Sequence, residues 1–453
     1  MNMDPISFHQ LAAACGGKLV VGDGAKTFRS VVKDSRSLQP GELYWALRGE
    51  NFDGHDFVAA AAVAGAAGAV VETVPPGSPG AFPLVVVPDS LAALQRLASW
   101  HRDRIKARVI CITGSNGKTS TKDFTASVVA TRFMVTKTAG NLNNHIGLPL
   151  TILAADSDHE VAVWEIGMNH PGEIATLARM ARPDIGIITN IGVAHIEFLG
   201  SRKGIAQEKG MMGEALTEHD LLVLPSHDEF TPSLAARTKA RIRLAGDGAQ
   251  LHAEDVRAAC DGLDFELVSG DEKVATHLPV TGEHMVRNAL LAVAAGVELG
   301  LSLRECASGL AATQLSKGRL ACLKVRGVTI LDDSYNANPD SMDAALHALR
   351  GLPGGGRRIA VLGRMGELGS YAEEGYRRVG RTAAGAADFV IVVGEEASPL
   401  ADEAEAAGAR AVQRVSDTHE AASALRELAV SGDTVLIKGS RSARMERVLE
   451  DFS

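Results

Sequence analysis

The chain has 453 residues, 46% hydrophobic and 22% charged, and its 46 Lys and Arg against 55 Asp and Glu give a formal net charge of −9. This composition excludes a collagenous, disordered or disulfide-stapled chain, and the acidic balance argues against a general nucleic-acid binder. Five scattered cysteines, and an N-terminus without a basic then apolar leader, predict reduced thiols and a cytoplasmic protein without membrane insertion. At roughly 150 residues per domain, the length predicts about three domains.

Short β-branched runs alternate with Ala-rich helical stretches, the pattern of parallel sheets covered by helices. The predicted fold class is α/β with three domains: a mixed α/β N-terminal domain at 1–88, a central P-loop ATPase-type parallel sheet at 89–316, and a C-terminal Rossmann-like domain at 317–453. A helix is expected at 90–105. Strands are expected in chain order at 30–33, 41–47, 69–72, 108–113, 161–166, 185–189, 221–224, 328–331, 359–362, 389–393 and 434–437.

The sharpest local motif is Val-Ile-Cys-Ile-Thr-Gly-Ser-Asn-Gly-Lys-Thr-Ser at 109–120, an apolar strand that leads through a Gly-rich turn into a helix. Such a turn lets backbone N–H groups approach phosphate oxygens, Lys118 would neutralise the β- and γ-phosphates, and the Thr119 hydroxyl can ligate Mg²⁺. Only two residues separate the glycines, where the general motif has four. The alternative is a tight strand-to-helix turn with an exposed lysine. The motif predicts nucleotide binding but does not choose between a switch, a motor, a kinase and a ligase.

Two further strand ends carry candidate metal ligands. Glu165, in Trp-Glu-Ile-Gly-Met-Asn-His at 164–170, ends an apolar strand, and a carboxylate facing a P-loop suits a Mg²⁺ that bridges phosphate oxygens. His195 follows the next strand, in Thr-Asn-Ile-Gly-Val-Ala-His, and leaves the same edge of the sheet. Taken singly, Glu165 also fits a salt-bridged strand end, His195 a structural histidine, and Lys209 a solvated helix lysine.

Together these segments resemble the Mur ligase family of ATP-dependent amide-bond-forming enzymes, through all three predicted domains. Leu-Asp-Asp-Ser-Tyr-Asn-Ala-Asn-Pro-Asp-Ser at 331–341 and Lys-Gly-Ser-Arg-Ser-Ala-Arg-Met-Glu at 438–446 closely resemble the member that adds D-alanyl-D-alanine. Asp-Ser-Arg at 34–36, Pro-Gly-Glu-Leu at 40–43 and Asp-Gly-His at 53–55 resemble the uridine-nucleotide-binding domain found in part of the family.

The resemblance implies ATP and Mg²⁺ as the cofactors. Lys118, Glu165, His195 and Lys209 are the expected catalytic residues, and Thr119, Glu165 and His195 the expected Mg²⁺ ligands. Lys209 matches the family's carbamylated lysine, and CO₂ addition would turn a cation that repels metals into an anion that orients one. The residues expected to bind ATP are Gly114, Ser115, Asn116, Gly117, Lys118, Thr119, Ser120, Asn288, Arg319, Asp333 and Tyr335. Tyr335 also fits a buried strand-end tyrosine.

Two positions depart from the family pattern. Met285 stands where the family usually has a second Asn near the adenine, and Arg364 stands where relatives usually carry Asp, in a loop near the incoming dipeptide. Asn-rich turns are also common without function. The substrate-binding residues that the resemblance implies are Ser35, Arg36, Asn141, Asn143, Asn144, Asn336, Asn338, Lys438, Ser440 and Arg441.

The implied activity is ATP-dependent ligation of D-alanyl-D-alanine to UDP-N-acetylmuramoyl-tripeptide through an acyl phosphate, which gives the pentapeptide precursor of peptidoglycan. The protein is expected to act as a monomer, without nucleic acid. One alternative is the relative that adds a single amino acid, which would carry an Asp-Tyr-Ala-His-type stretch at 333–339. Others are a folylpolyglutamate synthase, whose family lacks the first domain, and a nucleotide-binding switch without turnover, which would not need the second metal set.

Overall fold

The computed structural model describes residues 3–49, 51–76, 81–259 and 261–453, and the chain divides into two compact units. Unit 1 comprises Met1–Cys111, Phe133–Met168 and Glu173–Asp184, and unit 2 comprises Ile112–Arg132, Asn169–Gly172 and Ile185–Ser453. The α/β fold class is confirmed. The domain boundaries predicted after residues 88 and 316 remain predictions.

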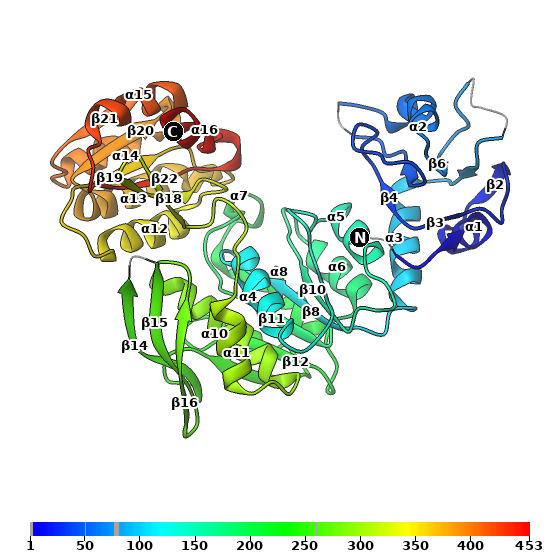
Figure 1. Ribbon diagram of the computed structural model, residues 1–453, viewed down its shortest axis with the longest axis horizontal. Coiled ribbons are helices and arrows are strands. Elements are labelled where there is room, and N and C mark those ends of the chain that lie inside the picture. Colours follow the sequence, from blue (N-terminus) through cyan, green and yellow to red (C-terminus); the bar gives the residue numbers. More distant parts are fainter. Residues whose placement is uncertain (1–2, 50, 77–80, 260) are drawn as a thin grey trace. The chain divides into compact units, whose positions relative to one another are not determined.

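Unit 1 begins with a small mixed α/β fold (Figure 1). A five-stranded sheet has the order β2-β7-β6-β5-β4, in which β2 pairs antiparallel with β7 and the other pairs are parallel. A two-stranded antiparallel sheet joins β1 to β3, and Tyr44 and Trp45 are fully buried in the core. The elements are β1 (Ile6–Ser7), α1 (Phe8–Cys15), β2 (Lys18–Val21), β3 (Thr27–Phe28), β4 (Val31–Val32), β5 (Leu43–Trp45), α2 (Val58–Val63), β6 (Gly68–Val71), β7 (Leu84–Val86) and α3 (Ser90–Arg102).

The remaining strands of unit 1 run in the order β8-β10-β9, and β10 and β9 are parallel. All five residues of β10 are buried, which matches its unbroken apolar sequence up to the terminal glutamate. The elements are β8 (Arg108–Thr113), β9 (Val135–Lys137), α5 (Gly147–Leu153), β10 (Val161–Glu165) and α6 (Glu173–Ala181).

Unit 2 contains a sheet in the order β16-β15-β14-β13-β12-β11, followed by the carboxyl end of β8, whose Thr113 carbonyl accepts from the Thr189 amide. Strands β11 to β14 pair in parallel, but β14, β15 and β16 form antiparallel hairpins. The strand–helix alternation expected up to residue 316 is therefore wrong at 251–278. The elements are α4 (Lys118–Val129), β11 (Ile185–Ile188), α7 (Ile196–Leu199), α8 (Arg202–Glu214), β12 (Leu221–Pro225), α9 (Thr231–Ala235), β13 (Arg241–Ala245), β14 (Leu251–Ala259), β15 (Gly262–Ser269), β16 (Glu272–Leu278), α10 (Glu283–Glu298) and α11 (Leu303–Ala311).

The C-terminal part of unit 2, drawn from yellow to red in Figure 1, is a six-stranded sheet in the order β17-β18-β22-β19-β20-β21. Only the edge strand β17 is antiparallel, so the expected Rossmann-like parallel sheet is present. Among the described residues, no helix is long and apolar enough to cross a membrane. The elements are β17 (Ala321–Val325), β18 (Val328–Asp333), α12 (Pro339–Gly351), β19 (Arg358–Leu362), α13 (Ala372–Ala386), β20 (Phe389–Val393), α14 (Ser398–Ala406), β21 (Val412–Val415), α15 (Thr418–Leu428), β22 (Thr434–Lys438) and α16 (Glu446–Phe452).

Candidate active site

The Gly-rich turn between β8 and α4 has the backbone of a phosphate cradle. Gly114 has φ +149° and Gly117 has φ +77°, a region that side chains disfavour, and a Cβ at Gly114 would come within 1.8 Å of the Thr189 hydroxyl. That hydroxyl donates to the Asn116 carbonyl (2.5 Å), and the Ser115 amide donates to the Asn190 carbonyl (3.0 Å). The turn is thus anchored to the loop after β11 and leads directly into helix α4.

Two cations lie at this turn. The Lys118 ammonium donates to the Gly114 carbonyl (2.8 Å), and Arg319 Nη2 donates to the Thr119 hydroxyl (3.2 Å). The Arg319 guanidinium stacks 4.2 Å above the Tyr335 ring, and its Nε is buried without a hydrogen-bond partner. A buried, unsatisfied donor is costly unless a ligand completes it. The turn therefore fits a polyphosphate, and Ser120, the next residue of α4, is buried.

Helix α10 carries Asn288, the residue that the sequence resemblance places near the adenine. Asn288 is buried, and its amide lies so near Gly117 that a Cβ there would meet Asn288 Oδ1 at 2.5 Å. Asn288 Nδ2 donates to the sulfur of Met285 (3.8 Å), which is also buried. The unusual methionine therefore acts as a weak acceptor for the asparagine and keeps its amide beside the phosphate turn.

Glu165 lies in unit 1 and is held by its own neighbourhood. Its carboxylate is only 3% exposed, its amide donates to the Thr138 hydroxyl (2.9 Å), and its Oε1 accepts from Asn143 Nδ2 (2.7 Å). Gly167, just beyond it, donates its amide to the Asn143 carbonyl (2.9 Å). Asn143 thus contacts both Glu165 and Gly167 and orients the Glu165 carboxylate. The sequence resemblance had placed Asn143 among the substrate-binding residues.

His195 and Lys209 lie in unit 2. His195 has φ +64° and precedes the short helix α7, and its Nδ1 lies 2.6 Å from Glu367 Oε2. Burial lowers the pKa of His195, whereas the neighbouring Glu367 acts in the opposite direction, and the contact with His195 lowers the pKa of Glu367. Lys209, on α8, is 1% exposed, and burial followed by repulsion from Lys118 places its pKa well below the ordinary value. Lys209 is therefore not the solvated lysine that its local sequence also allows.

Within the described residues, no three His, Cys, Asp or Glu side chains gather as a ready metal cage. A protein-bound Mg²⁺ usually keeps several waters and takes one or two carboxylates together with substrate phosphates. Thr119 in unit 2 offers a hydroxyl and Glu165 in unit 1 offers a buried carboxylate, and both are oxygen donors of the kind that Mg²⁺ takes.

The expected substrate residues of unit 1 lie on exposed or half-buried turns. Arg36 is exposed and pairs with Asp34 (2.7 Å), and its guanidinium lowers the pKa of that carboxyl to about 2. Ser35, between them, is half-buried, and Asn141 is exposed. Asn144 uses its Oδ1 to accept from the Gly147 amide (2.8 Å) at the start of α5, which is a structural role.

The expected residues of the C-terminal sheet are largely engaged with one another. Lys438 Nζ donates to Asp333 Oδ2 (2.5 Å) and to the Asn336 carbonyl (2.9 Å), and Asp333 also accepts from the Leu320 amide. Ser440 is buried beside Ser442, and its amide donates to the Arg364 carbonyl (2.7 Å). Arg441 pairs with Glu446, and the unusual Arg364 pairs with Glu396 (2.6 Å) and points its charge at that carboxylate.

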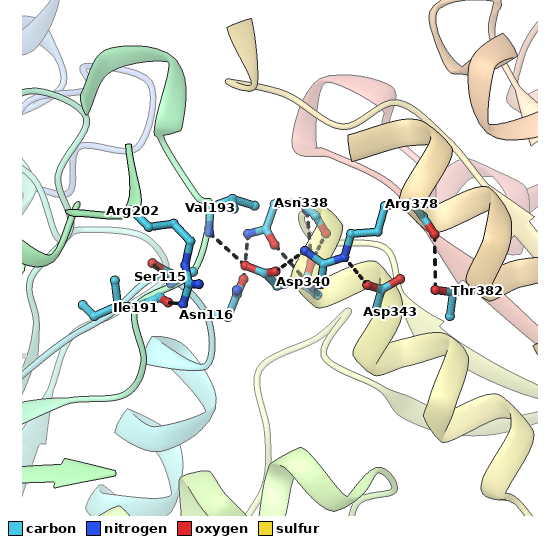
Figure 2. A network of polar contacts seen from close by, with 12 residues as sticks. Ser115, Asn116, Ile191, Val193, Arg202, Asn338, Asp340, Asp343, Arg378 and Thr382 are labelled. Atoms are coloured by element: carbon cyan, nitrogen blue, oxygen red, sulfur yellow. Dashed lines mark hydrogen bonds and ion pairs between the residues drawn. The ribbon is translucent and has the colours of Figure 1, made fainter. Parts of the chain in front are cut away.

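A polar network joins the start of α12 to the phosphate turn and to the loop after β11 (Figure 2). Asn338 Nδ2 donates to Asn116 Oδ1 (2.7 Å), and Asp340 Oδ2 accepts from the Val193 amide (2.8 Å). Arg378 holds Asp340 in place (2.9 Å) and also bonds Asp343 (2.8 Å). Sequence reasoning missed Asp340, Arg378 and Glu367. Only the acidic position in the first turn of α12 gave a local signal, and it indicated a helix start rather than a contact.

Three family models match the chain in sequence: "Mur ligase family, catalytic domain" at 27–99, "Mur ligase middle domain" at 112–296, and "Mur ligase, glutamate ligase domain" at 318–441. A Bacillus subtilis protein named UDP-N-acetylmuramoyl-tripeptide–D-alanyl-D-alanine ligase is 37% identical, over 93% of this chain and 92% of its own. A crystal structure of MurF from Acinetobacter baumannii is 32% identical with a TM-score of 0.90 and covers 99% of both chains. A MurF ligase from Thermotoga maritima in complex with ADP is 29% identical with a TM-score of 0.83, over 94% of this chain and 97% of its own.

These matches extend over nearly the whole chain and agree with the motifs at the phosphate turn, at both strand ends and in the C-terminal sheet. The chain belongs to the Mur ligase family.

Proposed function

We propose that this chain is an ATP-dependent ligase that joins D-alanyl-D-alanine to UDP-N-acetylmuramoyl-tripeptide and makes the pentapeptide precursor of peptidoglycan. The name of the Bacillus subtilis relative supports these substrates, and the ADP in the Thermotoga maritima structure supports the nucleotide. The observation that carries the chemistry is Arg319, whose buried and unsatisfied Nε lies next to a P-loop that already holds Lys118. A site built in this way stabilises charge that develops on transferred phosphate.

The reaction requires two displacements. The terminal carboxylate of the tripeptide attacks the γ-phosphorus, the bond to ADP breaks, and an acyl phosphate forms. The amine of the dipeptide then attacks the acyl carbon, phosphate leaves with the bonding electrons, and the amine loses a proton. Lys118 and Arg319 would neutralise the phosphate oxygens during both steps. Thr119, Glu165 and His195 are the proposed ligands of Mg²⁺, which supplies further neutralisation of phosphate charge when bound.

Lys209 is the proposed site of carbamylation. A neutral amine attacks CO₂, an N–C bond forms and a proton is released, so the residue must be deprotonated first. Burial and repulsion from Lys118 lower the pKa of Lys209, which favours the neutral amine. The resulting carbamate would be an anion beside Lys118, and the two opposite charges would attract each other.

Contacts with the UDP-substrate are proposed for Ser35, Arg36, Asn141, Asn143 and Asn144, and contacts with the dipeptide side for Asn336, Asn338, Lys438, Ser440 and Arg441. Asp333 and Tyr335 are proposed to meet the nucleotide. Lys438 also pairs with Asp333 and donates to the Asn336 carbonyl, so it would hold the 333–336 turn as well.

The direct test is an assay of phosphate release and of product mass with purified protein. Phosphate release above the level with ATP and UDP-tripeptide alone, together with a product heavier by the dipeptide minus water, is the expected result. Lysine and diaminopimelate forms of the tripeptide should be compared in parallel. Product formation from UDP-dipeptide and a free amino acid would instead favour the single-amino-acid ligase, and phosphate release independent of the dipeptide would refute ligation.

A further inference from the structure

The contact between His195 and Glu367 joins two loops that are distant in sequence. His195 follows β11 in the central sheet, whereas Glu367 lies in the loop after β19 in the C-terminal sheet. Their side chains meet with Nδ1 2.6 Å from Oε2, although the contact lacks the alignment of a full hydrogen bond. The imidazole is largely buried, with 16% of its surface exposed, so few groups compete for it.

Both residues adopt backbone conformations that side chains disfavour. His195 has φ +64° and Glu367 has φ +60°, a conformation that is unfavourable for a residue other than glycine. Neither position is a glycine, although both loops contain glycines. The surrounding contacts must therefore hold each side chain where it is.

The two loops are also packed backbone to backbone. The Glu197 amide donates to the Glu367 carbonyl (3.4 Å), and a Cβ at Gly369 would come within 3.0 Å of the Glu197 side chain. The Tyr376 hydroxyl, on α13, accepts from the Met365 amide (2.9 Å) and donates to the Met365 carbonyl (3.2 Å). These two hydrogen bonds fix the loop that carries Glu367. The carboxylate is thus presented to His195 by a supported loop.

We propose that Glu367 is a positioning residue that holds Nδ1 of His195, so that Nε2 is left as the metal-binding nitrogen. A histidine ligand commonly gives its second nitrogen to a carboxylate, which fixes the ring and raises its basicity. Here the carboxylate comes from the C-terminal sheet, so the metal ligand is oriented only when that sheet meets the central one. This inference rests on the proposed function, because it takes His195 to be a metal ligand.

The test measures metal binding rather than turnover. Mn²⁺ replaces Mg²⁺, and the full-length protein is mixed with a non-hydrolysable ATP analogue. Loss of the electron paramagnetic resonance signal of free Mn²⁺ measures how much Mn²⁺ is bound. The quantity of interest is the Mn²⁺ bound in addition to the one ion that the nucleotide itself carries. Removing an outer carboxylate of this kind weakens metal binding by about 10–100-fold, and we expect about tenfold for Glu367→Asn. Asparagine tolerates the left-handed backbone but is too short to reach Nδ1. Glu367→Gln keeps a neutral acceptor and should weaken binding less.

Two further variants make the result decisive. His195→Asn should lose the same Mn²⁺ ion, and Glu373→Gln, which changes an exposed carboxylate paired with Arg377 on α13, should bind as the unmodified chain does. Wild-type Mn²⁺ affinity in Glu367→Asn would overturn the proposal, and so would wild-type affinity in His195→Asn. Thermal unfolding curves identify any variant that fails to fold, in which case Glu367→Gln decides the matter. Failure of the proposed function would appear separately, as absence of ligated product with unmodified protein.

Discussion

The two strand ends that carry the candidate metal ligands are stabilised in opposite ways. Glu165 is held by Thr138 and Asn143, within 30 residues of it in the chain and inside the same unit. His195 is held by groups from the C-terminal sheet, because Asp340 bonds the Val193 amide and Glu367 contacts the imidazole. Glu165 is held by residues close to it in the sequence, whereas the loop of His195 is held by Asp340 and Glu367 from the C-terminal part of the chain.

The difference indicates how a ligase protects a reactive intermediate. An acyl phosphate is lost to water if it forms in an open site, so the site should become complete only on closure. Under the proposed function, a Glu165 held within unit 1 and a His195 held by Asp340 and Glu367 would give this order. The comparison therefore predicts that changes near Glu165 remove activity outright, and that changes in the C-terminal contacts reduce it by degrees.

The largest effect is expected from Glu165→Gln. The variant keeps the hydrogen bond from Asn143 but removes the charge, and loss of such a preorganised charge lowers kcat on the order of 10³-fold. The measurement is the steady-state rate of dipeptide-dependent phosphate release. Asp158→Asn, an exposed change in the same unit, should keep the full rate. If Glu165→Gln retained more than a tenth of the activity, Glu165 would be a structural strand end.

Lys209→Ala should lower the rate on the order of 10²-fold, because it removes the carbamate but leaves both strand ends intact. In the unmodified chain, the pKa of the Lys209 amine is lowered, so the amine is protonated only when the pH falls through that lowered pKa. A protonated amine cannot hold CO₂, so activity should fall over the same pH range. A ¹³C resonance from labelled bicarbonate should appear in the unmodified protein and vanish in the variant. Lys203→Ala, exposed on the same helix, serves as the control. A Lys209→Ala protein with the full rate would exclude the carbamate.

Arg319→Ala should raise KM for ATP about tenfold, since a hydrogen bond to a charged group contributes about 1.5–3 kcal/mol. The variant also removes the stacking on Tyr335, so Arg319→Lys, which keeps charge but not the planar face, should recover only part of the loss. Arg304→Ala, exposed on α11, should leave KM unchanged. An unaltered KM in Arg319→Ala would remove this residue from the nucleotide site.

The sequence predicted locally formed elements well and long-range contacts poorly. Strand β8 was predicted at its observed bounds, Arg108–Thr113, because its apolar run and the glycine turn that ends it are both local signals. The antiparallel hairpins at 251–278 were missed because they follow a long stretch of alternating strands and helices, and periodicity does not reveal strand direction.

The missed residues share one physical feature. Asp340 meets Val193 across 147 positions, and neither residue carries a pattern that points to the other. Lys438 was expected to contact substrate, yet its charge is neutralised by Asp333, a partner 105 residues away. Local sequence defines which groups an element presents, whereas the partner of a buried charge depends on how the sheets are arranged.

The smallest effect, and the sharpest test of the comparison, is expected from Asp340→Asn. The side-chain oxygen of the new asparagine can still accept from the Val193 N–H, but the negative charge that pairs with Arg378 is lost. A partly exposed ion pair of this kind contributes about 0.2–1 kcal/mol. The rate should therefore fall only about threefold, with KM for ATP nearly unchanged, since a loss of about 0.7 kcal/mol corresponds to this factor.

Combining this variant with Asn143→Ala shows whether the two strand ends are independent. Asn143 acts on Glu165 within unit 1 and Asp340 acts on the loop of His195 within unit 2, and effects of sites without shared partners add in free energy. The fold losses in rate should therefore multiply in the double variant. A double variant no slower than Asn143→Ala alone would mean that both contacts act on one common step, and the contrast between a preformed and a closure-dependent ligand would not hold.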